Sequence, residues 1–374
     1  MEITITYSFP RKLFNFTLLL IWVSHLQATD QSFTNFIFGD SLVDVGNNNY
    51  LFTLSKADSS PYGIDFRPSN GQPTGRFTNG RTISDIVGEA LGAKSATTPY
   101  LEPNTEVNTI HSGINYASGS AGIFDDTGLL FIGRVPLGEQ VSYFEKSRGY
   151  MVRMIGENGT KEMLKKSMFT ITIGSNDILN YIQPSIPFFS QDKLPTGVLQ
   201  DSMVFHLTTH LKRLHELGAR KFVVVGVGPL GCIPFARALN LIPAGKCSDQ
   251  VNQIVRGYNM KLRHSLATLN TEYHNTTFVY ANSYDLFLKL VLNYRQFGLE
   301  NADKPCCGGY FPPFTCFKGP NQNSSQAACE DRSKFVFWDA YHPTEAANLI
   351  VAKALLDGDQ TVATPFNIRY LNNL

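Results

Sequence analysis

Residues 35–41 read NFIFGDS, an apolar run followed by a glycine, an acid and a serine. The run has the length of a buried strand, and the glycine after it indicates a turn. Comparable apolar runs recur along the chain at 113–117, 169–173, 221–226 and 277–281. Stretches with helical spacing of apolar residues lie between several of them. This alternation predicts a mainly parallel, five-stranded sheet with helices on both faces.

The helical stretches have recognisable ends. Helices are expected at about 83–91, 199–217, 251–269 and 343–356. Gly92 and Gly218 end the first two, and Ser248 is the expected N-cap of the third. Pro343 suits the first turn of the last helix, because proline has no backbone N–H to leave unpaired there.

Polar clusters follow apolar, strand-like runs at four places: 39–41, 118–119, 174–177 and 339–342. In parallel sheets ligands bind beyond the carboxyl ends of the strands. We therefore expect the four clusters to converge on one edge of the sheet and to form the functional site.

Composition limits the function classes. The chain has 374 residues, a net charge of +1 and 43% apolar residues, which is enough for a large core. No basic excess favours nucleic-acid binding, and the charge does not suggest a strongly anionic substrate. No linker or internal repeat divides the sequence, so we expect one domain.

The N-terminus has the pattern of a secretory signal. Arg11 and Lys12 precede the apolar run 13–23, and small residues follow at Ala28 and Thr29. The run is shorter than the roughly 20 residues that a membrane span requires. We therefore expect a signal peptide at 1–28, a mature domain at 29–374 and an extracellular location, with no transmembrane span.

Cysteines and sequons agree with secretion. The chain has six cysteines: Cys232, Cys247, Cys306, Cys307, Cys316 and Cys329. An even count suits disulfides, although six cysteines allow about 15 connectivities. Cys232 with Cys247 would close a short loop, and the other four could pair among themselves. Sequons at Asn158, Asn275 and Asn323 are expected glycosylation sites.

Ser41, Asp339 and His342 together supply the parts of a serine nucleophile. A serine hydroxyl needs a base to take its proton, and a carboxylate orients that base. His342 is the candidate general base and acid, and Asp339 the residue that orients it. Each has an alternative: Ser41 could cap a helix through the pattern Ser-Leu-Val-Asp, and Asp339 and His342 could be ordinary polar residues before the last helix.

Oxyanion donors are also present. Asn176 follows the run 169–173 and could donate from its side chain, although asparagine is also common in turns. The backbone N–H groups of Ser41 and Gly119 are the other candidates, since a glycine amide can approach a ligand closely. Gly122 is the rival to Gly119.

These residues carry a family resemblance. FGDSLVDVGNNN at 38–49 resembles the first block of the plant GDSL esterase/lipases, in the SGNH hydrolase superfamily. NYASGSAG at 115–122, GSND at 174–177 and DAYHP at 339–343 are similar to the glycine, asparagine and histidine blocks. The Gly-x-Ser-x-Gly elbow of α/β-hydrolases is absent around Ser41.

The resemblance implies a flavodoxin-like, three-layer α/β/α fold. It also implies that Ser41, Gly119, Asn176 and His342 are the namesake residues, with Asp339 completing the triad. The expected activity is hydrolysis of lipid or other acyl esters through an acyl-enzyme. An acyltransferase with the same machinery, or a binding protein that has lost turnover, are the alternatives. No cofactor, metal, nucleic acid or obligate protein partner is expected.

Overall fold

The computed structural model describes residues 1, 33–103, 105, 112–183, 193–310, 316 and 328–374. Residues 33–374 form one compact unit. The expected signal peptide, apart from its first residue, lies outside the described residues. Among the helices that are described, none is both long and apolar enough to cross a membrane.

Within the described residues, seven strands form one sheet in the order β2-β3-β1-β4-β5-β6-β7. The strands are β1 (Asn35–Gly39), β2 (Thr98–Pro99), β3 (Ile114–Asn115), β4 (Met168–Thr172), β5 (Lys221–Val225), β6 (Thr277–Ala281) and β7 (Ala363–Thr364). The pairs from β2 to β6 are parallel, and β7 is antiparallel to β6. The five expected strands are confirmed, and two edge strands of two residues each are added.

Large apolar side chains fill both faces of the central strands. Phe36 and Phe38, which share one face of β1, are fully buried, and so is Phe169 of β4; Ile37, on the other face of β1, is 1% exposed. The rings of Phe36 and Phe169 lie 5.1 Å apart, and the ring of Phe144 packs 5.3 Å from Phe36. Burial on both faces explains why these strands read as continuous apolar runs and not as alternating patterns.

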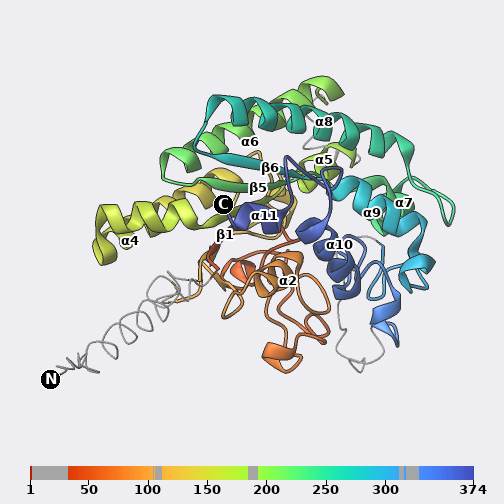
Figure 1. Cartoon of the computed structure of the whole chain (residues 1–374). Helices are drawn as coiled ribbons and strands as arrows, with labels where there is room; N and C mark the ends of the chain where they lie inside the picture. The colour runs from red at the N-terminus through yellow and green to blue at the C-terminus, as the bar shows by residue number, and fades with distance from the viewer. Residues whose placement is uncertain (2–32, 104, 106–111, 184–192, 311–315, 317–327) are drawn as a thin grey trace. The chain divides into compact units, whose positions relative to one another are not determined.

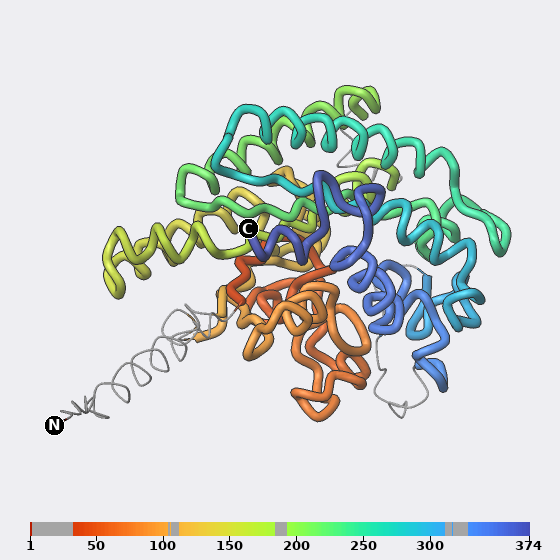
Figure 2. The backbone as a smooth tube through the Cα atoms, viewed as in Figure 1, coloured from red at the N-terminus to blue at the C-terminus, as the bar shows by residue number. Residues whose placement is uncertain are grey.

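Helices cover the sheet on both faces and complete the three-layer α/β/α architecture that was expected (Figure 1). One layer contains α4 (Leu137–Lys166), α6 (Thr196–Glu216) and α8 (Asp249–Glu272). The other contains α2 (Ile83–Ala90), α10 (Glu345–Asp357) and α11 (Ile368–Asn372). The shorter helices are α5 (Ser175–Ile182), α7 (Pro234–Leu239) and α9 (Ser283–Leu292), and Figure 2 traces the path between them.

The expected helices are present, with boundaries that differ from the expected ones by at most three residues. The Ser248 side chain accepts from the Val251 N–H and caps α8 as predicted. The last helix, α10, begins two residues after Pro343, with Thr344 as its N-cap. Pro343 is still paired with Phe337 in an isolated bridge, so the helix cannot start there.

The apolar segment before Asp339 is not a strand of the sheet. It forms isolated bridges, in which Phe335 pairs with Asn301 and Phe337 pairs with Pro343. Three disulfides are present: Cys232–Cys247, Cys306–Cys329 and Cys307–Cys316. The backbone N–H groups of Cys306 and Cys307 donate to the carbonyls of Phe337 and Trp338. The disulfide loop is therefore bonded directly to the segment that carries Asp339.

Candidate active site

Ser41 lies in a tight turn just beyond the carboxyl end of β1. The N–H groups of Val43 and Asp44 donate to the Asp40 carbonyl, and no helix begins at this turn. The Asp44 carboxylate accepts from Gly46, Asn47 and Gly119 instead of from the Ser41 backbone. The helix-capping alternative for Ser41 therefore does not describe this geometry.

Two buried groups fix the strand end that carries this turn. A Cβ on Gly39 would lie 2.3 Å from the Thr172 carbonyl oxygen of β4, so only glycine fits at this close approach. The fully buried Gln140 of α4 accepts from the Gly39 N–H and donates to the Gly39 carbonyl, both at 2.8 Å. The Gly39 carbonyl also accepts from the Ser118 N–H, so α4 and the segment after β3 together hold the backbone before Ser41.

Ser41, His342 and Asp339 form a hydrogen-bonded series. The Ser41 Oγ is 2.7 Å from His342 Nε2, and His342 Nδ1 is 2.8 Å from both carboxylate oxygens of Asp339. His342 is 7% exposed and Asp339 is fully buried. The two segments, 301 residues apart in sequence, meet at the carboxyl edge of the sheet as the sequence predicted.

Asp339 is held as a charged, fully bonded carboxylate. Burial acts to raise its pKa, but the charge of His342 and several hydrogen bonds hold the pKa below its ordinary value. The donors are the backbone N–H groups of Tyr341 and His342 and the Tyr62 hydroxyl, the last at 2.8 Å. Sequence reasoning missed Tyr62, because a single tyrosine 277 residues from its partner carries no pattern.

A pocket of about 440 Å³ opens above this series. Its polar lining includes Ser41, His342, Asn176 and Ser120. Apolar side chains from several loops and helices also line the pocket. They include Leu54, Phe77, Phe131, Leu179, Ile233 and Tyr341. The aromatic loop at 311–314, suggested by the sequence as an acyl pocket, lies outside the described residues.

Asn176 stands in the first turn of α5 and lines this pocket. One hydrogen of its side-chain amide donates to the Ala121 carbonyl at 2.9 Å. An amide nitrogen carries two hydrogens, so the second remains for a ligand in the pocket. The Asn176 side chain is therefore oriented by the glycine block, and the structure brings it to the same pocket as Ser41.

Gly119, unlike Asn176, does not line the pocket. Its N–H donates to the Asp44 carboxylate at 3.0 Å, and Gly119 is not among the described residues that line the pocket; nor is Gly122. A Cβ at Gly119 would lie within 2.8 Å of Phe77, Asn48 and Ser55, so close packing requires the glycine. In this structure the Gly119 N–H is therefore already engaged by the Asp44 carboxylate.

Ser120, the next residue, does line the pocket. Its φ is 65°, which is uncommon for a residue other than glycine and re-aims the backbone at this point. Among the described residues its N–H has no hydrogen-bond acceptor. No local pattern at 118–122 predicted that Ser120 would line the pocket.

Two buried carboxylates tie the sequence blocks together. Asp44 bonds the first block to Gly119, as described above, and burial raises the pKa of Asp44 to about 6. Asp177 accepts from the N–H groups of Ile123 and Phe124 and from the Thr127 hydroxyl. Burial raises the pKa of Asp177 as well. Both acids lie inside the blocks that the sequence singled out, but their structural role was not predicted.

Asp40 is a third buried carboxyl, adjacent to the nucleophile candidate. Its Oδ1 accepts from the Leu42 N–H at 3.0 Å, whereas Oδ2 is buried with no hydrogen-bond partner among the described residues. Burial raises the pKa of Asp40 to about 7, and the nearby Asp177 carboxylate acts in the same direction. The Leu42 N–H and His342 oppose this shift.

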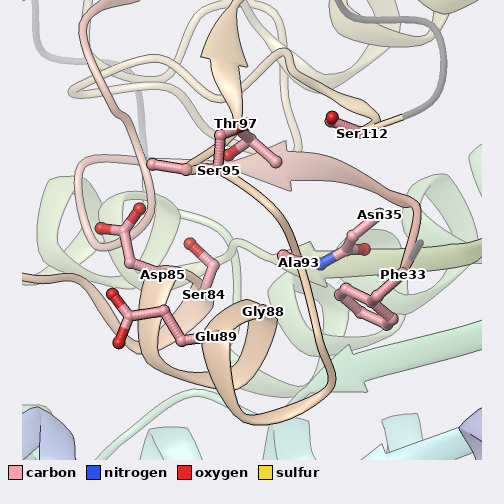
Figure 3. A pocket seen from close by; sticks show the side chains of 11 residues that line it. Phe33, Asn35, Ser84, Asp85, Gly88, Glu89, Ala93, Ser95, Thr97 and Ser112 are labelled. Carbon is pink, nitrogen blue, oxygen red and sulfur yellow. The ribbon is translucent and has the colours of Figure 1, made fainter. Parts of the chain in front are cut away.

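A second hollow, of about 20 Å³, lies at the opposite end of β1 beside α2 (Figure 3). Asn35, Ser84 and Asp85 are among its lining residues. A space of this size holds about one water molecule. It therefore does not compete with the pocket at Ser41 as a substrate site.

The remaining expectations concern the three glycosylation sites and the absence of a metal site. Asn158 is exposed on α4, and Asn275 is exposed between α8 and β6. Asn323 lies outside the described residues. Within the described ranges, no three His, Cys, Asp or Glu side chains are grouped so that they could hold a metal ion.

A three-layer α/β fold with serine, imidazole and carboxylate bonded in series at the carboxyl edge of its sheet is typical of serine hydrolases. The family model for GDSL-like lipases and acylhydrolases matches residues 36–355. The chain belongs to this family and, as a member of it, is a carboxylic-ester hydrolase.

Curated relatives from Arabidopsis thaliana agree. The chain is 87% identical to GDSL esterase/lipase At5g41890 over 362 residues, which cover 95% of this chain and 98% of the relative. It is 46% identical to GDSL esterase/lipase At3g50400, with 91% of each chain covered. It is 38% identical to GDSL esterase/lipase 7, with 95% of this chain and 97% of the relative covered.

Proposed function

We propose that this protein is a secreted serine esterase in which Ser41 attacks the acyl carbonyl of a lipid or other acyl ester. The observation that carries the proposal is the series Ser41–His342–Asp339, with contacts of 2.7 and 2.8 Å, at the base of a largely apolar pocket. An acyl chain would occupy the apolar part of the pocket, which places its carbonyl beside the serine hydroxyl.

The reaction would proceed in two halves. His342 Nε2 takes the Ser41 proton as Oγ attacks, and then gives that proton to the departing alkoxide, which leaves an acyl-enzyme. A water molecule next gives a proton to His342 and attacks the acyl carbon, and the proton returns to Ser41 as the acid departs. Asp339 keeps the Nδ1 proton in place and stabilises the imidazolium.

The negative charge on the tetrahedral oxygen needs donors that face the pocket. We assign this role to the Ser41 N–H and the free hydrogen of the Asn176 amide, as the sequence suggested. For the third donor we favour the Ser120 N–H over that of Gly119, because the Gly119 N–H already donates to Asp44. The Ser120 residue lines the pocket and its N–H has no acceptor among the described residues.

Secretion is supported by three features. The basic and apolar pattern at 1–28 is that of a signal peptide. All six cysteines are paired in disulfides, which persist in an oxidising compartment. The sequon residues Asn158 and Asn275 are exposed and accessible to glycosylation.

The first test is hydrolysis of p-nitrophenyl esters of graded acyl length by the secreted protein, beside Ser41→Ala. We expect turnover that disappears in the variant, with an optimum length that reflects the apolar pocket. Turnover that appears only with an added alcohol acceptor would indicate an acyltransferase. No turnover and no labelling of the folded protein by a serine-directed phosphonate would reject the serine mechanism.

A further inference from the structure

Two apolar segments form an exposed surface at the mouth of the pocket. We call residues 50–54 and 129–132 the apolar rim. Its strongly exposed side chains, with exposed fractions, are Phe52 (85%), Leu54 (70%), Leu129 (59%), Leu130 (51%), Ile132 (51%) and Tyr50 (48%). Scattered exposed apolar residues are normal on proteins, but a contiguous group marks an interaction surface.

Backbone contacts join the two segments of the apolar rim into one unit. Thr53 and Ile132 form an antiparallel bridge, and the Leu54 N–H donates to the Phe131 carbonyl at 3.0 Å. The Thr53 hydroxyl donates to the same carbonyl at 2.9 Å. The exposed side chains are therefore displayed on a fixed scaffold, which lowers the entropy cost of docking them on a surface.

Ile132 adopts a rare backbone conformation, with φ 71° and ψ −87°. For a β-branched residue this region is strained, and residues with such strain cluster at functional sites. The Ile132 side chain is also half exposed, close in sequence to the exposed Leu129 and Leu130. Ile132 therefore combines an unfavourable backbone conformation with an exposed apolar side chain, at one position of the apolar rim.

The apolar rim continues into the candidate active site. Leu54, Leu130 and Phe131 line the 440 Å³ pocket together with Ser41 and His342. An apolar chain that leaves a surface in contact with the rim would therefore meet the side chains of Leu54, Leu130 and Phe131 as it enters the pocket that contains Ser41.

Charge is absent from the apolar rim. No Asp, Glu, Lys or Arg occurs at 50–55 or 128–133. The flanking cations are already engaged: Lys56 donates to the Asn49 carbonyl and pairs with Asp58, and Arg134 donates to the Thr127 carbonyl. The chemistry of the rim therefore suits uncharged, apolar matter and does not select anionic headgroups.

We propose that the apolar rim docks the protein on the surface of aggregated lipid, so that acyl esters enter the pocket directly from the lipid phase. The docking is inferred only from the exposed side chains of the apolar rim and does not depend on the proposed function. The delivery of esters to Ser41 rests on the proposed function.

Binding is tested without turnover by flotation of the full secreted chain carrying Ser41→Ala with phosphatidylcholine vesicles. We expect the protein to float, and the bound fraction to be unchanged in about 0.5 M NaCl, because salt screens charges but not apolar contacts. Adding Phe52→Ser and Leu129→Ser, neither of which lines the pocket, should lower the bound fraction at least about fivefold.

The matched control carries Phe205→Ser and Leu292→Ser, two side chains of the same types that are 67% and 55% exposed far from the rim in sequence. It should float like the parent. Equal flotation of the rim variant and this control, or no flotation of the parent, would overturn the proposal. A parent that is dimeric by light scattering, and becomes monomeric in the rim variant, would overturn it in favour of contact between two copies.

Delivery is tested with Ser41 intact. The rim variant should keep its rate on dissolved p-nitrophenyl butyrate within about twofold and lose about tenfold on emulsified tributyrin. Equal losses on both substrates would contradict delivery from the lipid phase. Flotation of the Ser41→Ala protein combined with no ester turnover by the wild type would reject the proposed function and leave the docking surface standing.

Discussion

At the scale of single residues, Asn176 gives the sharpest test of the oxyanion assignment. Asn176→Ala removes a donor that acts on the transition state more than on the bound ester, so kcat should fall about 10²–10³-fold with little change in KM. The lost bond to the Ala121 carbonyl should cost only about 1 kcal/mol of stability. Steady-state kinetics on a soluble ester, with a melting curve, checks both; a rise in KM at constant kcat would contradict the role.

Gly119 and Ser120 are separated by a second pair of substitutions. A Cβ at position 119 would meet Phe77, Asn48 and Ser55, so Gly119→Ala should destabilise the fold by about 1–3 kcal/mol. Ser120→Gly keeps the N–H and relieves the backbone at φ 65°, so its kcat should stay near the wild-type value. A Gly119→Ala protein with unchanged stability and a kcat reduced 10²-fold or more would return the donor role to Gly119.

At the scale of elements, the sequence predicted best where pattern and position coincide. Each central strand is buried on both faces and so appears as a short apolar run, and the polar clusters after β1 and β4 both line the pocket as expected. After β3 it is Ser120, one residue beyond the expected cluster 118–119, that lines it. Edge strands β2 and β7 have two residues each, which is too short to produce a recognisable strand pattern in the sequence. The segment before Asp339 reads as a strand, yet its partners are the loop at Asn301 and Pro343.

The residues of the candidate site also divide into those that a sequence pattern indicates and those that it does not. Ser41, Asn176, Asp339 and His342 could be named as candidates because each lies in a recognisable block, and the structure places all four at or beside one pocket. Tyr62 and Gln140 could not, because each acts on one distant group through a single side chain. The direction of the Gly119 amide depends on the fold around Asp44, which no local pattern encodes.

The disulfide loop gives a prediction at this scale. Cys306 and Cys307 are hydrogen-bonded to the segment before Asp339, so the Cys306–Cys329 bond restrains the part of the chain that holds Asp339 and His342. Cys306→Ser with Cys329→Ser should lower stability by about 2–5 kcal/mol and reduce kcat at 25 °C. Mild reduction of the wild type should impair activity in the same way.

The measurement is ester turnover well below the melting temperature of each variant, so that loss of activity is not global unfolding. Cys232→Ser with Cys247→Ser is the matched control for the loss of a disulfide as such. Full activity after complete reduction of the Cys306–Cys329 bond would show that the loop does not restrain the segment that carries Asp339 and His342.

At the scale of the whole molecule, two groups of buried carboxyls give the free energy of unfolding opposite dependences on pH. Asp40 and Asp44 have pKa values raised by burial to about 7 and about 6, so the folded state holds protons that the unfolded chain releases near pH 4. Their contribution is complete below about pH 4 and is lost as pH rises through 6 and 7. Asp339 and Asp85 have lowered pKa values, so their contribution is present above about pH 4 and is lost as pH falls.

The combined effect is a stability maximum in weakly acidic solution, and Asp40 allows it to be tested. Asp40→Asn removes a carboxyl that must ionise in a buried place, while its side-chain oxygen can still accept from the Leu42 N–H. Relative to the wild type, the variant should gain about 2–4 kcal/mol of unfolding free energy between pH 4 and pH 8, because a shift of one pKa unit corresponds to about 1.4 kcal/mol. Urea unfolding at a series of pH values measures this difference, with the exposed Asp126→Asn as the control that should leave it near zero. A constant difference between Asp40→Asn and the wild type across this range would mean that Asp40 is ionised in the folded protein at low pH, and that the buried carboxyl beside Ser41 is stabilised by a contact other than the Leu42 N–H.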